Sequence, residues 1–572
     1  MNTLSVEAPP RKFVAPGLLI NTWQDIKPYY ATLNNATINS LSDLQQWLAN
    51  RSELETVIQE NTGWRYIRMT CDTTNQMFAD DYTFFITQIE PEIAPENNKL
   101  NLKLLASPFL EQLQNTKYAN YIRAVKTQVE LFKEENIPLI ANVQQKQQQY
   151  GVIASAQTIT VDGKEITLQQ AGIYLKSANR EKRKEVYLQI SNRRLQDKPA
   201  LDVLFNELLQ LRNQIAVNAG FKNFRDYMFA AMNRFDYTVN DCELFHESIK
   251  QQILPLCQTM DEQRKQKLGY SDLMPWDTEV DVTGKPSVKP FNTADELVEK
   301  TIACFNDVDS ELANCIKLLK NLKRLDLDSR KGKAPGGYNY PLYETGVPFI
   351  FMNSSGLLRD LVTMVHEGGH AVHSVLTHEL DFVEFKNCPS EVAELASMSM
   401  ELISMEHWHH FFTDKDELKR AKEEHLESLL DILPWVAAID KFQHWIYTNP
   451  NHTTAERNAS WTNIFAEYSS TVVNRTGLEN ITENIWQKQL HIFEVPFYYI
   501  EYGMAQLGAI ALWKNYKENP ARTIEQYKQA LSLGYTKTIP DIYKAAGVKF
   551  DFSAAYIKSL ADFVKEELSK LN

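Results

Sequence analysis

Two histidines and a glutamate form the strongest chemical signal in the sequence. The segment His366-Glu367-Gly368-Gly369-His370 matches the pattern HExxH. Residues four apart on an α-helix are separated by about 400°, so both imidazoles project from one face and can bind one metal ion. Glu367 follows the first ligand, where its carboxylate can hold a water molecule instead of the metal itself. The segment therefore predicts a metal site with a general base beside it.

A second segment supplies candidates for a third metal ligand. A catalytic zinc ion takes three protein ligands and keeps one position open for water. Residues 388–401, CPSEVAELASMSME, have proline and acid where a helix begins. Glu394 and Glu401 are seven residues apart and share a helix face, so we assign Glu394 to the metal and Glu401 to orienting a ligand histidine. Glu391 competes with Glu394, and spacing alone leaves both open.

Two further histidine groups have other interpretations. His373 stands three residues after His370, but a fourth protein ligand would close a catalytic site. We expect His373 to orient a ligand, to face the substrate or simply to pack. Residues 407–410, HWHH, are more typical of an interface or surface patch than of a metal site.

The elements that must position these residues are predicted to be mostly helical. Capping boxes that begin at Ser42, Thr293 and Thr453 predict helix starts. Apolar residues three and four apart predict helices at 180–220, 295–325, 415–447, 454–474 and 519–533.

Strand signals are confined to short segments. Residues 158–167 alternate around Asp162-Gly163, which is typical of a hairpin. A second apolar run, VPFIFM, occupies 347–352.

Residues 332–356 contain five of the 20 glycines, and they directly precede the HExxH segment. Such density indicates a flexible or tightly turned segment that a substrate backbone could approach.

Composition and charge narrow the class of protein. The chain has 572 residues, of which 44% are hydrophobic and 11% aromatic, so it is neither disordered nor collagen-like and is long enough for two lobes. Its net charge of −13 argues against nucleic acid as a partner. A membrane-spanning helix needs about 18 apolar residues, and no apolar run approaches that length. The opening residues also lack a signal-peptide pattern. Six cysteines without CxxC spacing indicate reduced thiols. We therefore expect a cytoplasmic protein without a membrane partner.

The two motifs together resemble the thimet-oligopeptidase family of zinc peptidases, in particular its oligoendopeptidase F and Pz-peptidase branch. The family's ligand glutamate matches Glu394, so the resemblance favours Glu394 over Glu391. Gly368 is a departure, because many relatives have a bulky residue there, and we expect looser helix packing. The resemblance covers most of 180–560 and rests on HEGGHAVHS, EVAELASMSMEL, GKAPGGY, PFIFMN and HIFEVPFYYIEY.

The resemblance implies one Zn²⁺ ion per chain, bound by His366, His370 and Glu394. Glu367 would take a proton from the attacking water and deliver it to the leaving amine. The oxyanion formed from the peptide carbonyl needs further donors. The family places a histidine and tyrosines there, which match His491 and Tyr498, and Tyr502 lies one helical turn further on.

The resemblance also predicts the fold and the path of the substrate. We expect a mainly α, two-lobed helical ellipsoid with a deep substrate channel and a small β-sheet next to the zinc site. An N-terminal helical lobe, 1–180, would precede a catalytic region, 181–572. The strand at 347–352 would be the sheet edge with which a short peptide pairs, and the glycine-rich segment would pivot or wrap around that peptide. Substrate contacts are assigned to Gly336, Gly337, Tyr338 and Phe349.

Two other functions fit the same motifs. Related helical zinc carboxypeptidases and dipeptidyl carboxypeptidases also combine HExxH with a later glutamate. A non-catalytic peptide-binding or structural zinc protein is the second alternative, although a structural site needs four ligands and no base such as Glu367. The sequence leaves cleavage preference and oligomeric state open.

Overall fold

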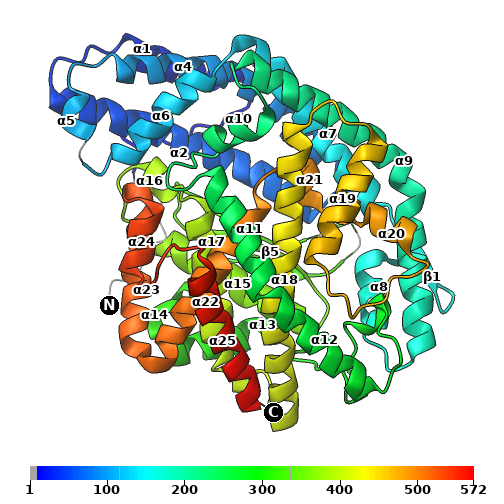
Figure 1. Cartoon of the computed structure of the whole chain (residues 1–572). Coiled ribbons are helices and arrows are strands. Elements are labelled where there is room, and N and C mark those ends of the chain that lie inside the picture. Colours follow the sequence, from blue (N-terminus) through cyan, green and yellow to red (C-terminus); the bar gives the residue numbers. More distant parts are fainter. Residues whose placement is uncertain (1–9, 115, 331, 335, 572) are drawn as a thin grey trace. The chain divides into compact units, whose positions relative to one another are not determined.

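The computed structural model describes residues 10–114, 116–330, 332–334 and 336–571. It is mostly helical with two small sheets, which confirms the mainly α prediction (Figure 1). The chain forms two compact units. Unit 1 comprises the chain up to Ile137, Lys289–Leu418 and Gly508–Phe550, and unit 2 comprises Pro138–Val288, Lys419–Leu507 and the chain from Asp551. A division of the chain at residue 180 stays a prediction.

Unit 1 contains the N-terminal helices and both motif helices. Its strands are β3 (Leu325–Asp328), β4 (Tyr338–Tyr340) and β5 (Phe349–Ser354). Its helices are α1 (Trp23–Asn35), α2 (Leu41–Cys71), α3 (Gln76–Phe84), α4 (Glu90–Leu105), α5 (Glu111–Gln114), α6 (Ala119–Leu131), α13 (Ala294–Val308), α14 (Ser310–Asn321), α15 (Leu358–Leu376), α16 (Val383–Lys386), α17 (Ser390–Met405), α23 (Pro520–Ser532) and α24 (Ile539–Ala545).

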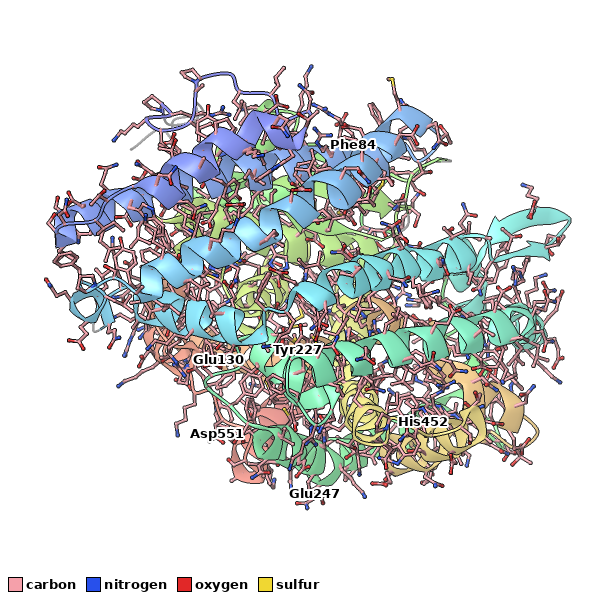
Figure 2. The ribbon with its side chains drawn as sticks, turned by 90° about the horizontal axis from the view of Figure 1, so that it is seen from above. Phe84, Glu130, Tyr227, Glu247, His452 and Asp551 are labelled. Carbon is pink, nitrogen blue, oxygen red and sulfur yellow. The ribbon has the colours of Figure 1, made fainter. Side chains whose placement is uncertain are left out.

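Unit 2 contains the longest helix and a hairpin. Besides α7 (Ile137–Ser155), whose first residue belongs to unit 1, two helices have residues in both units: α18 (Lys415–Thr448) and α22 (Tyr499–Glu518). The other elements of unit 2 are β1 (Thr158–Val161), β2 (Lys164–Thr167), α8 (Leu168–Leu175), α9 (Arg180–Asn218), α10 (Phe224–Ala231), α11 (Val239–Gln252), α12 (Leu254–Leu268), α19 (Thr454–Tyr468), α20 (Glu479–Asn484), α21 (Leu490–Glu494) and α25 (Ala554–Leu571). In Figure 2, Tyr227 on α10, Glu247 on α11 and His452 after α18 mark this unit.

Polar caps explain where several helices begin. The side chains of Thr293 and Thr453 accept backbone N–H groups at the starts of α13 and α19, as predicted. The predicted cap at Ser42 is wrong by two residues, because Ser40 caps α2. The long helix predicted after Thr293 is two helices, since Asp309 leaves the helical conformation and caps α14.

The sheet of unit 1 has the order β3-β5-β4. β3 is parallel to β5 and β4 is antiparallel, with Leu325 and Asn339 on either side of Ile350. The strand predicted at 347–352 is therefore present as β5, but the prediction that it forms the sheet edge is wrong. Its first four residues are buried and apolar, as expected for a strand covered on both faces. Among the described strands, β4 and β3 form the edges.

The predicted hairpin of unit 2 is confirmed. β1 and β2 pair antiparallel from Thr158 opposite Thr167 to Val161 opposite Lys164. The two turn residues, Asp162 and Gly163, have φ values of 52° and 75°, which is the left-handed conformation that a two-residue hairpin turn requires.

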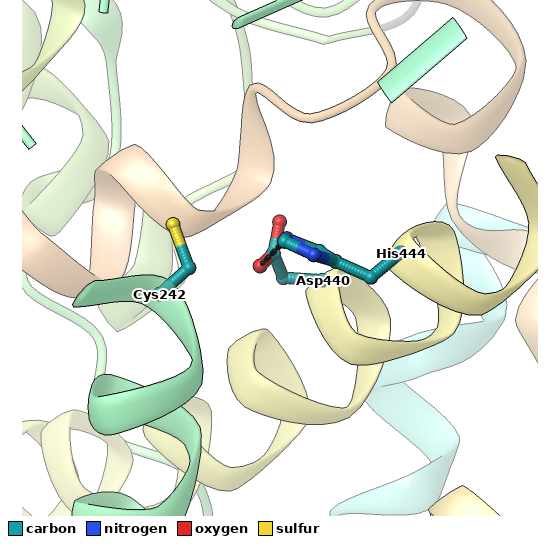
Figure 3. Close-up of side chains that lie close together, drawn as sticks. All are labelled: Cys242, Asp440 and His444. Carbon is teal, nitrogen blue, oxygen red and sulfur yellow. Dashed lines mark ion pairs between the residues drawn. The ribbon is translucent and has the colours of Figure 1, made fainter. Parts of the chain in front are cut away.

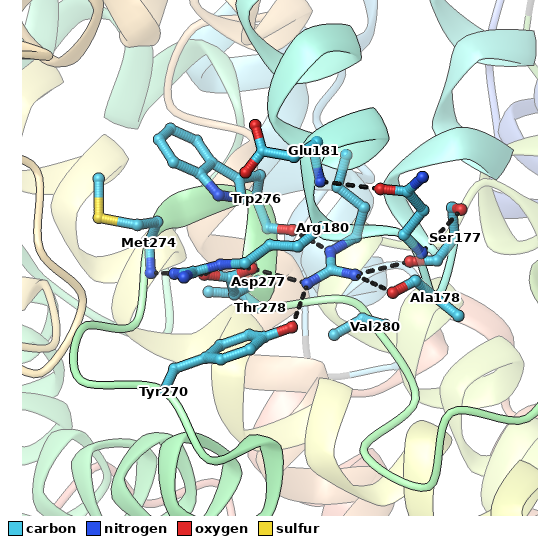
Figure 4. Close-up of polar contacts among 12 residues, drawn as sticks. Ser177, Ala178, Arg180, Glu181, Tyr270, Met274, Trp276, Asp277, Thr278 and Val280 are labelled. Atoms are coloured by element: carbon cyan, nitrogen blue, oxygen red, sulfur yellow. Dashed lines mark hydrogen bonds and ion pairs between the residues drawn. The ribbon is translucent and has the colours of Figure 1, made fainter.

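A buried ion pair fixes the start of α9 in unit 2 (Figure 4). The guanidinium of Arg183 donates to Asp277 Oδ1 at 2.7 Å and to the carbonyl of Trp276 at 2.9 Å. Arg180 donates to Asp277 Oδ2, also at 2.7 Å. The side chains of Arg183 and Asp277 are fully buried, so the carboxylate is compensated by two permanent cations.

The described part of the chain offers no helix with both the length and the apolar character that crossing a bilayer requires.

Candidate metal centre

Two glycines allow the HExxH helix to pack closely. A Cβ atom on Gly369 would lie 2.6 Å from Cα of Ser397 and 2.8 Å from the carbonyl oxygen of Ala396. The backbone of α15 therefore approaches that of α17 at a point where no side chain fits. A Cβ atom on Gly368 would lie 2.9 Å from the ring of Phe305. The expectation that Gly368 loosens the packing is wrong, because this position is tightly filled.

The close packing of α15 and α17 brings three predicted ligands together. Glu394 Oε2 lies 3.3 Å from Nε2 of His366 and 3.6 Å from Nε2 of His370. The two rings are nearly perpendicular, with centroids 4.9 Å apart. Tetrahedral zinc with bonds of about 2.0–2.1 Å separates its ligand atoms by about 3.3 Å, so this donor set fits zinc. Glu391 is not part of this group of ligand atoms.

Two of the three ligands are oriented by a neighbour on α17. Glu401 Oε1 lies 2.6 Å from Nδ1 of His366, which leaves Nε2 for a metal. The hydroxyl of Ser397 donates to Glu394 Oε2 at 3.0 Å. Sequence reasoning predicted that Glu401 orients a ligand histidine. It missed Ser397, although Ser397 is three residues after Glu394 and therefore on the same helix face.

The charges of the metal-free ligands suit a cation. Burial opposes ionisation of Glu394, but the charges of His370 and His366 and hydrogen bonds outweigh it and lower its pKa to about 2. Burial lowers the pKa of His370 to about 4. His366 is only partly buried, and its hydrogen bonds to Glu394 and Glu401 raise its pKa well above the usual value.

Glu367 has the environment of a general base. Burial raises its pKa to about 7, and the positive charge of His366 opposes this rise. The amide of Asn339, on the edge strand β4, donates to the backbone carbonyl of Glu367 at 3.4 Å. A carboxyl group with a pKa near neutrality can both accept and return a proton.

The remaining histidines of unit 1 lie apart from this group of ligand atoms. His373 is buried, with Nε2 3.4 Å from Sγ of Cys388, and burial lowers its pKa to about 3. His373 therefore packs in the interior. His409 and His410 lie 3.5 and 2.7 Å from Asp307 and form a partly exposed surface cluster, as expected.

The glycine-rich segment is attached to its neighbours by hydrogen bonds. The buried ammonium of Lys333 donates to the carboxylate and the carbonyl of Asp326, both at 2.9 Å. The side chain of Asn353 donates to the carbonyls of Ala334 and Gly336 at 2.8 and 3.0 Å. These bonds hold this stretch against β3 and β5. The predicted pivoting of the segment stays a prediction.

Two residues assigned to the substrate contribute to an aromatic core. Tyr338 stacks on Phe351 with centroids 4.8 Å apart and shares a 2.6 Å hydrogen bond with Thr70. Phe349 is buried, with its ring 6.0 Å from that of Trp64. Gly336 has a φ of 100°, and Gly337 precedes β4. The assignments of Gly336, Gly337, Tyr338 and Phe349 to the substrate stay predictions.

The predicted oxyanion residues form an aromatic cluster in unit 2. The ring of His491 lies 6.0 Å from Tyr498, 5.6 Å from Tyr502 and 4.8 Å from Tyr499. The side chain of Gln489 contacts Nδ1 of His491 at 2.7 Å. The catalytic roles of His491, Tyr498 and Tyr502 stay predictions.

Two buried arginines hold the backbone around this cluster. Arg212 donates to the carbonyls of Ile492 and Phe493, and Arg234 donates to the carbonyl of Phe497 at 2.5 Å. Phe497 has a φ of 70°, a strained conformation that only a surrounding structure can maintain. Sequence reasoning missed both arginines, because they are far from residue 491 along the chain.

The architecture is that of a helical zinc-peptidase fold, with an HExxH helix packed on a glutamate-bearing helix. Peptidase family M3 matches residues 173–562, and the Peptidase M3 N-terminal domain matches residues 20–132. The chain therefore belongs to peptidase family M3, which confirms the resemblance.

Individual relatives agree with this family. Oligopeptidase PepF of Bacillus subtilis is 22% identical over 67% of this chain and 58% of its own length. An oligoendopeptidase F homolog of Borreliella burgdorferi is 24% identical over 70% of this chain and 67% of its own length. The alignment therefore spans little more than half of the first relative. A solved structure of Pz peptidase A with an inhibitor is 25% identical, with a TM-score of 0.92 over 98% of this chain and 99% of that one.

Proposed function

We propose that the chain is a zinc-dependent oligoendopeptidase that hydrolyses internal bonds of short, unstructured peptides. The observation that carries the proposal is the convergence of His366, His370 and Glu394 on one point, with the carboxylate of Glu367 next to the first ligand. Membership of family M3 and relatives named oligopeptidase and oligoendopeptidase support the same reaction.

One zinc ion bound by the three ligands would act as a Lewis acid on the peptide carbonyl and acidify a water molecule. Glu367 accepts the proton of that water and returns it to the leaving amine. Glu401 and Ser397 keep their ligand partners in place through hydrogen bonds. The proposal keeps His491, Tyr498 and Tyr502 as donors to the oxyanion, as the family resemblance implies.

The substrate part of the proposal uses the edge strand β4. A peptide added to Tyr338–Tyr340 would pair with an exposed strand edge, and Asn339 links that edge to the carbonyl of Glu367. Gly336 and Gly337 directly precede β4, and because glycine has no side chain, they do not obstruct a peptide at the start of the strand. Substrate contacts of Tyr338 and Phe349, a cytoplasmic location and the absence of nucleic-acid and membrane partners belong to the same proposal.

A peptide of about ten residues with a fluorophore, an internal quencher and an amidated C-terminus tests the proposal. We expect zinc-dependent cleavage at an internal bond, loss of cleavage with a chelator and recovery with added zinc. Mass spectra of the products distinguish the alternatives. Release of residues only from peptides with a free C-terminal carboxylate would indicate a carboxypeptidase, and zinc binding without cleavage of any peptide would refute an enzymatic role.

A further inference from the structure

A second group of metal-binding side chains lies in unit 2, on helices that the peptidase motifs do not include. Cys242 comes from α11, and Asp440 and His444 come from successive turns of α18 (Figure 3). One ligand atom from each residue lies within 4.8 Å of those from the other two. Cys242 and Asp440 are fully buried, and His444 is 8% exposed.

The carboxylate of Asp440 lacks a permanent cation. Its partners among the described residues are two histidines: His246 Nε2 lies 2.8 Å and His444 Nε2 lies 3.1 Å from Oδ2. Asp277, another fully buried carboxylate of unit 2, contacts two guanidinium groups. A buried carboxylate needs a positive partner, and neither histidine is a permanent cation.

Several polar atoms in this buried group lack hydrogen bonds. They are Oδ1 of Asp440 and both ring nitrogens of His444. Although His444 Nε2 and Asp440 Oδ2 are only 3.1 Å apart, the two side chains do not have hydrogen-bond geometry. That spacing is close to the about 3.3 Å between two ligands of one tetrahedral zinc ion. The atoms thus have the separation of ligands to a shared ion.

The surroundings favour a permanently bound ion. The His444 ring packs against Phe229 and Phe497, with centroids 6.0 and 5.5 Å away and nearly perpendicular planes. An aromatic surrounding limits access of water. A thiolate and a carboxylate would neutralise a divalent cation, and a sulfur ligand selects zinc-like over magnesium-like ions.

We propose that unit 2 binds a second divalent transition-metal ion, of the zinc type, through Cys242, Asp440 and His444, with His246 holding the Asp440 carboxylate. The ion joins α11 to α18 in the interior of unit 2. With both carboxylate oxygens of Asp440 bound, Cys242, Asp440 and His444 supply the four ligand atoms of a closed site, and its role is therefore structural. This inference does not depend on the proposed peptidase reaction.

Cobalt provides a direct test, because among the three groups of possible ligands in the described structure only this one includes a cysteine. The full chain is produced in cobalt-supplemented medium, so that the buried position fills during folding. We expect two cobalt ions per chain by elemental analysis and a thiolate-to-cobalt charge-transfer band in the near ultraviolet. In the His370→Ala chain, which lacks a catalytic ligand, one ion and the full band should remain.

Matched cysteine variants assign the band. Cys242→Ser should lose the band and one ion, whereas Cys257→Ser, at another buried cysteine of unit 2, should keep both. If Cys242→Ser does not fold, the wild-type protein still decides the question. Three outcomes would overturn the proposal: one cobalt per wild-type chain, two ions without a thiolate band, or a band that survives in Cys242→Ser. One cobalt per wild-type chain would mean that these side chains form a hydrogen-bonded cluster without a metal.

Discussion

Two of the three groups of possible metal ligands among the described residues, the His366 group and the Asp440 group, are built alike but differ in exposure. Each takes two residues four apart on one helix, His366 and His370 on α15 or Asp440 and His444 on α18, and a third ligand from another helix. The imidazoles of the first group keep 19% and 18% of their surface exposed. Cys242 and Asp440 in the second group are fully buried.

This difference is consistent with the proposed catalytic role of the first group and the proposed structural role of the second. A metal that activates water needs an open coordination position, whereas a structural metal needs a closed one. The first group also has a carboxylate, Glu367, that no ligand role requires. Ligand spacing alone therefore does not distinguish the two groups. The partial exposure of the two imidazoles and the adjacent carboxylate of Glu367 do.

Removing the base should have the largest effect. Glu367→Gln keeps the shape of the side chain but cannot accept a proton, so we expect cleavage to fall by about 10²–10⁴-fold. Zinc content should stay the same, because Glu367 is not a ligand. Initial rates on a quenched peptide and zinc analysis of the same sample measure both. Glu379→Gln, at an exposed glutamate shortly after α15, is the control. Substantial turnover by Glu367→Gln would remove the base assignment.

Separating the two motif helices should have the next largest effect. A methyl group at Gly369 meets the backbone of α17 at 2.6 Å, and backbone cannot turn away. We expect Gly369→Ala to shift Glu394, reduce cleavage by about 100-fold and destabilise unit 1 by about 1–3 kcal/mol. Competition with a chromogenic chelator measures zinc affinity, and thermal unfolding measures stability.

The neighbouring glycine is the matched control for that variant. In Gly368→Ala the new methyl group meets the ring of Phe305 at 2.9 Å, and a side chain can rotate. We expect Gly368→Ala to lose some stability but to bind zinc with nearly the wild-type affinity. Equal losses of zinc affinity in both variants would show that helix approach at Gly369 is not what positions Glu394.

A smaller effect is expected from the carboxylate that orients His366. Glu401→Gln replaces an anion 2.6 Å from His366 Nδ1 by a neutral amide. Such changes typically weaken zinc binding by about 10–100-fold. Chelator competition measures the change, with Glu406→Gln as the control, because Glu406 contacts Trp513 and Lys517 instead. Unchanged zinc affinity in Glu401→Gln would contradict the orienting role.

The sequence predicts the catalytic group better than its surroundings for a physical reason. Helical periodicity alone places His366 and His370 on one face and relates Glu394 to Glu401, because all four positions depend on local geometry. The close approach of the α15 and α17 backbones at Gly369 depends on which helix packs there, and a glycine in the sequence does not indicate which helix that is.

The sheet and the second ligand group were inaccessible for a similar reason. β3, Leu325–Asp328, alternates apolar and acidic residues over only four positions, which is too few to identify a strand. The edge position expected for β5 came from the family resemblance alone. Cys242 and Asp440 are far apart along the chain, and neither lies in a recognisable motif. Only the packing of α11 and α18 brings them together.

The smallest expected effect concerns a carboxylate that, unlike Asp440, is held by permanent cations. Burial opposes ionisation of Asp326, but hydrogen bonds from Arg330 and Lys333 outweigh it and lower its pKa to about 2. Because the folded-state pKa is below that of an unfolded aspartate, about 3.9, ionised Asp326 contributes stability at higher pH. That contribution should be lost as the pH falls from about 4 to about 2.

Asp326→Asn should therefore be less stable than wild type near neutral pH, and the two stabilities should converge in acid. Urea unfolding at a series of pH values, compared between the two proteins, cancels the titration of all other carboxylates. Asp328→Asn is the control, because Lys333 contacts only the backbone carbonyl of Asp328. A constant difference between wild type and Asp326→Asn across this range would mean that the charge of Asp326 does not hold the glycine-rich segment. Asp440 is a buried carboxylate that faces no lysine or arginine in the described structure. The comparison between Asp326, held by cations, and Asp440 would then no longer be supported.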